Sequence, residues 1–238
     1  MFTHHGKSRT LSHNLKIASL LSFVAGVVNV AGFLAVQKLT TNVTGHFAFF
    51  VDEVFKLHFG ASIAYFLYIF FFFLGSFTSS FLIEVISRKS MRYVFVIPTI
   101  IECIILFFVA LFGKKLITEN PNLIAFSLLF AMGLQNSLVT RISGALIRTT
   151  HLTGLFTDLG IELSQLFFRK TEEQRRKLIT NTQLRLRIIC FFFMGGVIGG
   201  LTYSSLGLHN LFIPIIILIS GLFYDTLKFK IIHWKRNH

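Results

Sequence analysis

The chain has 238 residues, of which 53% are hydrophobic and 30 are phenylalanine, and its mean hydropathy is +0.70. This composition excludes a soluble globular protein, because apolar runs that can cross about 30 Å of hydrocarbon recur along the chain. The formal net charge of +13 would suggest a nucleic-acid partner in a soluble protein. In a membrane protein it predicts basic cytoplasmic loops, and we expect no nucleic-acid binding.

The first half of the chain predicts three spans. A basic cytoplasmic segment at 1–14 precedes them, and the first three-span repeat covers residues 15–112. Its spans lie at 15–36, 61–86 and 93–112. A mixed segment at 47–59 is too short and too polar to cross alone, so it predicts a half-helix or an interfacial helix.

The second half predicts the same order of elements. A polar connection at 113–122 separates the halves, and the second three-span repeat covers residues 123–227. Its spans lie at 123–139, from about 188 onward, and at 208–227. The strongly basic run at 169–187 must lie outside the hydrocarbon, and a basic cytoplasmic tail follows at 228–238.

A short polar motif, T-T-x-x-T-G, occurs at 40–45 and again 109 residues later at 149–154. Three further motifs also occur twice, in the same order. They are G-x-x-N at 26–29 and 133–136, F-F-F-x-G at 71–75 and 191–195, and I-P at 97–98 and 213–214. Four ordered matches at offsets of 107–120 residues indicate duplication of a half-protein.

The distribution of lysine and arginine orients the spans. With a cytoplasmic N-terminus, the inside segments hold 19 of the 23 basic residues and the outside segments hold 4. This predicts six transmembrane helices with both termini cytoplasmic. Because each half has three spans, the second half is inverted. The predicted fold is an all-α membrane protein of two inverted three-span repeats, with interrupted or half-helices at the T-T-x-x-T-G stretches.

Inverted repeats with interrupted helices are typical of transporters and channels, since a broken helix exposes backbone N–H and C=O groups. We predict that the two T-T-x-x-T-G stretches and nearby amides form one site for a small polar solute or ion. The candidate residues are Thr40, Thr41, Thr44, Gly45, Thr149, Thr150, Thr153, Gly154, Asn29, Gln135 and Asn136. The competing interpretation is that these stretches are structural turns that cap interfacial helices.

Four ionisable residues are candidates for a proton or ion relay. Glu102 is the acidic residue deepest in a span, where an unpaired charge is costly. Asp158 and Glu162 are one helical turn apart, and His151 precedes them. The competing roles are a protonated, hydrogen-bonded acid for Glu102 and solvated or capping residues for the other three. The sequence contains no strong metal-ligand or cofactor-binding motif, and we expect neither group.

Small residues at four-residue spacing mark two of the spans. They are Gly75, Ser76, Ser79 and Ser80 in one and Gly195, Gly196, Gly199 and Gly200 in the other. Such spacing permits close helix approach, so these faces predict either the central crossing of the two halves or a homodimer contact. The phenylalanine run before each is interpreted as lipid-facing.

Four stretches carry a family resemblance. They are A-G-x-x-N at 25–29, T-N-V-T-G at 41–45, A-M-G-L-Q-N at 131–136 and R-T-T-H-L-T-G-x-x-x-D-L-G at 148–160. They resemble the YoaK-like family of bacterial multi-spanning membrane proteins, a domain of unknown function. The resemblance covers about residues 15–227 and implies a location in the bacterial inner membrane but no activity. That family typically has aspartate at the position of Asn29, so any proton or cation step at that aspartate would be lost here.

The sequence therefore predicts a transporter or channel for a small polar solute or ion. Two alternatives stay open: a membrane-embedded enzyme that uses Asp158, Glu162 and His151, and a structural or assembly partner without a pore. A water-filled path to the repeated stretches would favour transport. A metal bound by two or more of those three side chains would favour an enzyme, and a sealed apolar interior would favour the partner.

Overall fold

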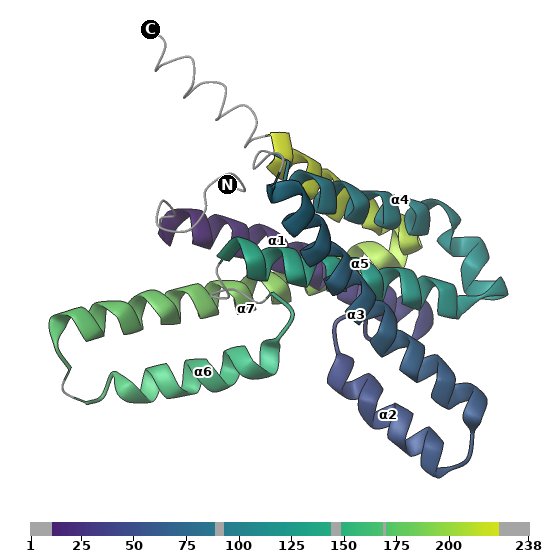
Figure 1. Cartoon of the computed structure of the whole chain (residues 1–238), viewed down its shortest axis with the longest axis horizontal. Coiled ribbons are helices and arrows are strands. Elements are labelled where there is room, and N and C mark those ends of the chain that lie inside the picture. The colour runs from purple at the N-terminus through teal and green to yellow at the C-terminus, as the bar shows by residue number, and fades with distance from the viewer. Residues whose placement is uncertain (1–10, 89–92, 144–148, 169, 224–238) are drawn as a thin grey trace, which may run out of the picture.

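A computed structural model of the chain describes residues 11–88, 93–143, 149–168 and 170–223. These residues form helices joined by short turns, with no strand among them (Figure 1). The helices are α1 (Leu11–Val36), α2 (Val43–Phe55), α3 (Phe59–Ser87), α4 (Val96–Glu119), α5 (Pro121–Ser143), α6 (Leu152–Gln165) and α7 (Glu172–Leu206). A 3-10 turn, η2 (Gly207–Leu211), leads into a last helix over 212–223.

Five helical stretches are long and apolar enough to cross a membrane. They are Leu15–Val36, Phe59–Ser87, Val96–Glu119, Pro121–Arg141 and Glu172–Phe223. The last stretch covers 52 residues and is interrupted at Gly207, where φ is +55°. Glycine is the residue that adopts this backbone conformation at little cost. The chain is thus an all-helical, multi-pass membrane protein.

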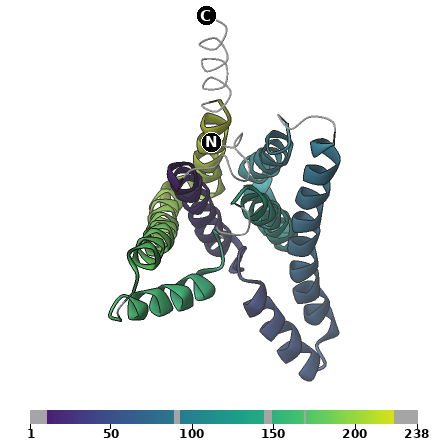
Figure 2. The ribbon, with the colours of Figure 1, turned by 60° about the vertical axis from the view of Figure 1, so that its left-hand side comes forward.

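The two segments predicted to be too short for crossing are short helices, α2 and α6, and neither is among the five spanning stretches. Each forms a hairpin with the long helix that follows it, α2 with α3 and α6 with α7. Figures 1 and 2 show the two hairpins pointing away from the bundle in different directions. Most of the polar connection predicted at 113–122 is helical, because α4 continues to Glu119 and α5 begins at Pro121.

Two close helix crossings hold the two halves together. A methyl group built on Gly26 of α1 would overlap the carbonyl oxygen of Phe192 in α7. A methyl group on Gly133 of α5 would likewise overlap the carbonyl oxygen of Phe72 in α3. Only glycine fits at such a distance, because the facing group is backbone and cannot move aside.

The partners at these crossings are reciprocal. Gly195 of α7 faces the carbonyl oxygen of Phe23 in α1, and Gly75 of α3 faces that of Phe130 in α5, each too closely for a side chain. The prediction that small residues form the crossing of the two halves therefore agrees with the contacts. These contacts of the glycine faces are made within one chain, and a homodimer contact stays a prediction.

Candidate functional site

The first T-T-x-x-T-G stretch contains the start of α2. Asn42 is the N-cap, and its side-chain oxygen accepts a hydrogen bond from the backbone N–H of Gly45 at 3.0 Å. Thr44 and Gly45 are therefore already helical, and the chain is non-helical only before Val43. In this respect the predicted break over the whole motif was too long.

The second stretch starts α6 in the same register. His151 occupies the N-cap position but makes no side-chain capping hydrogen bond. The final glycine of each motif is explained by its N-cap. A methyl group on Gly45 would lie 2.8 Å from Nδ2 of Asn42, and one on Gly154 would lie 2.7 Å from Nε2 of His151. In both copies the N-cap side chain lies over the third helical residue and leaves no room for a side chain.

Both stretches line one cavity of about 800 Å³. The lining includes matched positions from the two halves of the sequence. The matched pairs are Asn29 with Asn136, Thr41 with Thr150, Asn42 with His151, Val43 with Leu152, Thr44 with Thr153, and Phe72 with Phe192. Leu39, Gly45 and Ala48 complete it. The cavity thus lies between the first turns of α2 and α6 and the middle of the bundle.

The two halves of the cavity differ in their hydrogen bonds. The hydroxyl of Thr41 donates to Oδ1 of Asn29 at 2.8 Å. Oδ1 of Asn136, at the matched position, is inaccessible to solvent and has no hydrogen-bond partner in the part of the chain that the structure describes. A buried amide oxygen without a partner is costly, and this one belongs to a residue that lines the cavity.

The lining is polar but nearly uncharged. Among the described residues that line it, none is aspartate, glutamate, lysine or arginine, and His151 is the one ionisable side chain. The first N–H groups of a helix have no intrahelical partner and carry a partial positive charge. With α2 and α6 both starting here, the cavity offers hydroxyls, amides and backbone N–H groups to a ligand.

Several predicted site residues do not line this cavity. Thr40 and Thr149 are fully buried, and the hydroxyl of each lacks a hydrogen-bond partner among the described residues. Gln135 is also buried and donates from Nε2 to the carbonyl oxygen of Leu21 at 2.7 Å. Gly154 is outside the lining as well. These residues shape the wall behind the cavity or join helices to one another.

The relay candidates are not brought together. Glu102 is fully buried in α4, with neither carboxyl oxygen bonded within the described structure, and it does not line the cavity. Asp158 and Glu162 both bind Arg185 of α7, Asp158 at 3.1 Å. His151 lies instead in the threonine cavity. Among the described residues no group of three His, Cys, Asp or Glu could hold a metal ion.

The sequence did not identify three residues that the structure places at the cavity or in the ion pairs of α6. Phe72 and Phe192 were interpreted as lipid-facing, yet both line the cavity; only the next residues, Phe73 and Phe193, are largely exposed. Arg185 was hidden in a basic run that had been assigned to topology alone. The duplicated F-F-F-x-G motif was the available signal for the two phenylalanines, because a matched pair at a repeat is expected near the repeat axis.

Comparison with known proteins identifies the family of this chain. A family model described as "Protein of unknown function (DUF1275)" matches residues 17–224. The chain belongs to this family. The match confirms the prediction of an uncharacterised family over nearly the whole chain, and it supplies no activity. No curated protein and no solved structure matches the chain.

Proposed function

We propose that this protein is a transporter that binds a small polar solute or ion in the threonine cavity. The observation that carries the proposal is that both copies of a motif 109 residues apart line one cavity. A structural turn would need no counterpart from the other half of the chain. A site built from both halves is the arrangement found in transporters with inverted repeats.

We further propose six spans and an inverted repeat. The 52-residue stretch Glu172–Phe223 is about 78 Å long as a straight helix at 1.5 Å per residue, which is far more than one crossing needs. The interruption at Gly207 divides it into a fifth and a sixth span. The reciprocal glycine contacts support the symmetry, because Gly26 corresponds to Gly133 in the sequence and Gly75 to Gly195.

The orientation follows from the 19-to-4 division of basic residues. The test is a cysteine at Lys177 in the hairpin of α6 and α7, and another at Lys56 after α2, in a background without Cys103 and Cys190. An impermeant thiol reagent added to intact cells should label the Lys56 position only. Labelling at Lys177 would overturn both the orientation and the inversion.

The uncharged lining limits the solute class. Threonine hydroxyls and amides bind neutral polar groups, and the starts of α2 and α6 favour an anion over a cation. The part of the lining that the structure describes contains no carboxylate, so little in it would replace the hydration of a cation. A small neutral polar solute or a monovalent anion fits best.

Access from both membrane faces separates a transporter from a structural cavity. Cysteines at Thr44 and Thr153 should react with an impermeant reagent in right-side-out and in inside-out vesicles. A cysteine at Ser22, which is fully buried in α1 and outside the cavity lining, is the matched control and should react in neither. Reaction of the first two positions from a single face only would contradict alternating access.

Flux measurements test the site itself. The double substitution Thr44→Val with Thr153→Val keeps side-chain shape and removes two hydroxyls. Wild-type protein in vesicles should take up at least one member of a panel of radiolabelled neutral polar solutes and monovalent anions, and the double variant should lose most of that uptake while its thermal unfolding is unchanged. Uptake equal to that of the wild type would exclude these hydroxyls from the site.

A further inference from the structure

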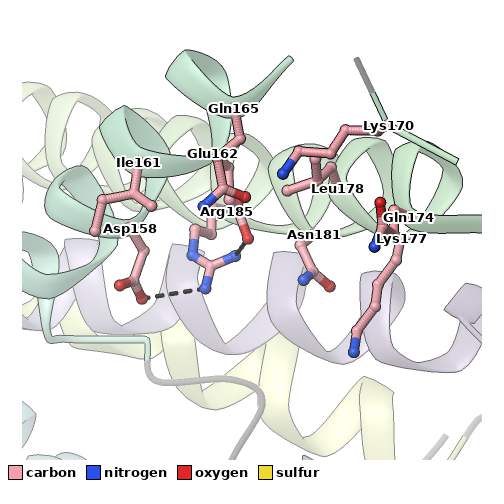
Figure 3. Close-up of a pocket in the computed structure, with 10 residues that line it drawn as sticks. All are labelled: Asp158, Ile161, Glu162, Gln165, Lys170, Gln174, Lys177, Leu178, Asn181 and Arg185. Atoms are coloured by element: carbon pink, nitrogen blue, oxygen red, sulfur yellow. Dashed lines mark hydrogen bonds and ion pairs between the residues drawn. The ribbon is translucent and has the colours of Figure 1, made fainter. Parts of the chain in front are cut away.

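A second cavity of about 400 Å³ lies between α6 and α7, in the hairpin that projects from the bundle (Figures 1 and 3). Its volume is within the range of small-molecule sites. None of its lining residues lines the threonine cavity. We propose that it binds the headgroup of an aminophospholipid, meaning a primary ammonium group joined to a phosphodiester.

At the end of this cavity formed by Asp158, Glu162 and Arg185, negative charges outnumber positive charges. Arg185 binds both Asp158 and Glu162 (Figure 3), so the three side chains together carry one net negative charge. The residue Glu162 is only 7% exposed. Its second oxygen, Oε2, is inaccessible and has no hydrogen-bond partner among the described residues. A buried carboxylate oxygen in this state calls for a donor, and a charged donor gives the strongest bond.

The other end of the cavity is positive. Lys170 and Lys177 line it, and neither has an ion-pair partner in the part of the chain that the structure describes. Figure 3 shows Lys177 and Gln174 toward one end and Asp158 with Arg185 toward the other, and the side chain of Lys170 extends from the first end toward Gln165. An anionic phosphate fits the lysine end. The cavity therefore suits a ligand that carries a donor cation and an anion on one short chain.

The surroundings of the cavity favour a lipid over a soluble ligand. The turn that follows α6 contains Phe167 and Phe168, whose exposed fractions are 89% and 70%. Ile161 lines the cavity and is 50% exposed. Adjacent aromatic and aliphatic side chains of this size are typical of a segment that lies in the membrane interface. Acyl chains of a lipid whose headgroup occupies the cavity would cover them.

The ammonium requirement makes the proposal selective. Phosphatidylethanolamine has a primary ammonium that can donate to the carboxylates of Asp158 and Glu162, which share a single arginine. Phosphatidylcholine has the same charge but no N–H, and phosphatidylglycerol has no ammonium. Loss of a charge-assisted hydrogen bond to a buried group amounts to about tenfold or more in affinity. The expected order of binding is therefore ethanolamine lipid first, with choline and glycerol lipids at least about tenfold weaker.

The test measures lipid retention by the full-length protein with native mass spectrometry, using dioleoyl lipids with these three headgroups. Lys170→Gln leaves the Arg185 ion pairs intact and should weaken ethanolamine lipid about tenfold. Glu162→Gln should abolish the preference for ethanolamine over choline. Lys114→Gln, at an exposed lysine of α4, is the matched control and should bind as the wild type does.

Three outcomes would overturn the proposal. Equal retention of ethanolamine and choline lipids would show that the cavity makes no hydrogen bond to the ammonium group. A Lys170→Gln variant that binds lipid like the control would show that Lys170 does not contact the phosphate. This variant is informative even if Glu162→Gln does not fold. Binding of soluble O-phosphoethanolamine as tight as that of the lipid would assign the cavity to a soluble ligand. None of these results depends on whether the threonine cavity transports a solute.

Discussion

The two short helices α2 and α6 begin in the same way but are held by different chemistry. Each starts one residue after its N-cap and contributes its first turn to the same cavity. The contacts of α2 with α3 are largely aromatic, with Phe49 stacked on Tyr65 at a ring distance of 5.3 Å and His46 at 5.0 Å from Tyr68. Between α6 and α7 the main polar contacts are the two ion pairs that Arg185 forms with Asp158 and Glu162.

This difference separates what the two copies of the motif share from what they do not. The first turn of each short helix has one threonine, which lines the cavity, and one glycine, which meets the N-cap side chain. The far side of each helix only has to hold it against a neighbour, and either aromatic or ionic contacts can do that. Under the proposed orientation, the aromatic anchor of α2 lies at the outer face of the membrane and the ionic anchor of α6 at the cytoplasmic face. The predictions below test this separation.

The largest effect is expected at the glycine crossings, which the two halves share. Gly195→Leu would force a branched side chain into the carbonyl oxygen of Phe23, and backbone on both sides cannot move apart without separating α1 from α7. We expect loss of folded protein, because overpacking costs about 1–3 kcal/mol even where side chains can adjust. Detergent-solubilised yield and thermal unfolding measure this.

Phe193→Leu is the matched control, because Phe193 is two positions away on the same helix and 70% exposed. It should keep nearly wild-type yield. Equal yields of the two variants would mean that the crossing of α1 and α7 is not close-packed.

The second effect is loss of the ionic anchor of α6. Arg185→Gln would leave the buried carboxylate of Glu162 without its charge partner, and breaking a buried pair costs about 3–5 kcal/mol. Arg185 is 22% exposed and Asp158 is half-exposed, so we expect about 2–3 kcal/mol, lost chiefly as detachment of α6. Limited proteolysis after Arg169 and hydrogen exchange of α6 report on this detachment.

Arg141→Gln is the control, since the ion pair of Arg141 with Glu84 is exposed on both sides. It should cost less than about 1 kcal/mol. If both variants lower the free energy of unfolding by the same amount, Arg185 behaves as an ordinary surface residue. Its ion pairs would then not hold α6 against α7.

The third effect concerns the aromatic anchor of α2 and pH. Burial lowers the pKa of His46 below its ordinary value, and the charge of Lys38 acts in the same direction. The unfolded chain therefore binds a proton more readily than the folded chain, and stability falls as the pH drops below about 6.5. Above that value His46 is neutral in both states and has no effect on the pH dependence. Thermal unfolding at pH 7.5 and at pH 5.5 measures the loss.

His46→Gln should remove most of this pH dependence. His209→Gln, at an exposed histidine of η2, should leave it unchanged. A wild-type protein equally stable at both pH values would show that His46 is not desolvated by the packing of α2 on α3.

The sequence alone predicted the helices and the meeting of the repeated stretches better than the side-chain partners. Apolar runs and turn residues place a span within a few residues, and repeat symmetry brings matched positions together. It could not place Thr40 and Thr149 behind the lining, because one residue along an irregular turn changes which side chain faces inward. It also gave no means to select Arg185 among the basic residues of the hairpin, since any one of them could reach a carboxylate on the facing helix.

The smallest effect separates the two glycines of α6. Gly160 has no neighbouring atom within 4 Å of where a side chain would begin, so its glycine serves no packing purpose. Alanine there should stabilise the helix by up to about 1 kcal/mol, because glycine in a helix interior is that much less favourable. Gly154→Ala should not stabilise α6, because the new methyl group would displace the ring of His151 from its place over the first turn. Hydrogen exchange of the α6 amides compares the two variants directly. If Gly154→Ala protects α6 as well as Gly160→Ala does, the N-cap ring does not require the motif glycine. The ring of His151 would then move aside for a methyl group at no cost to α6.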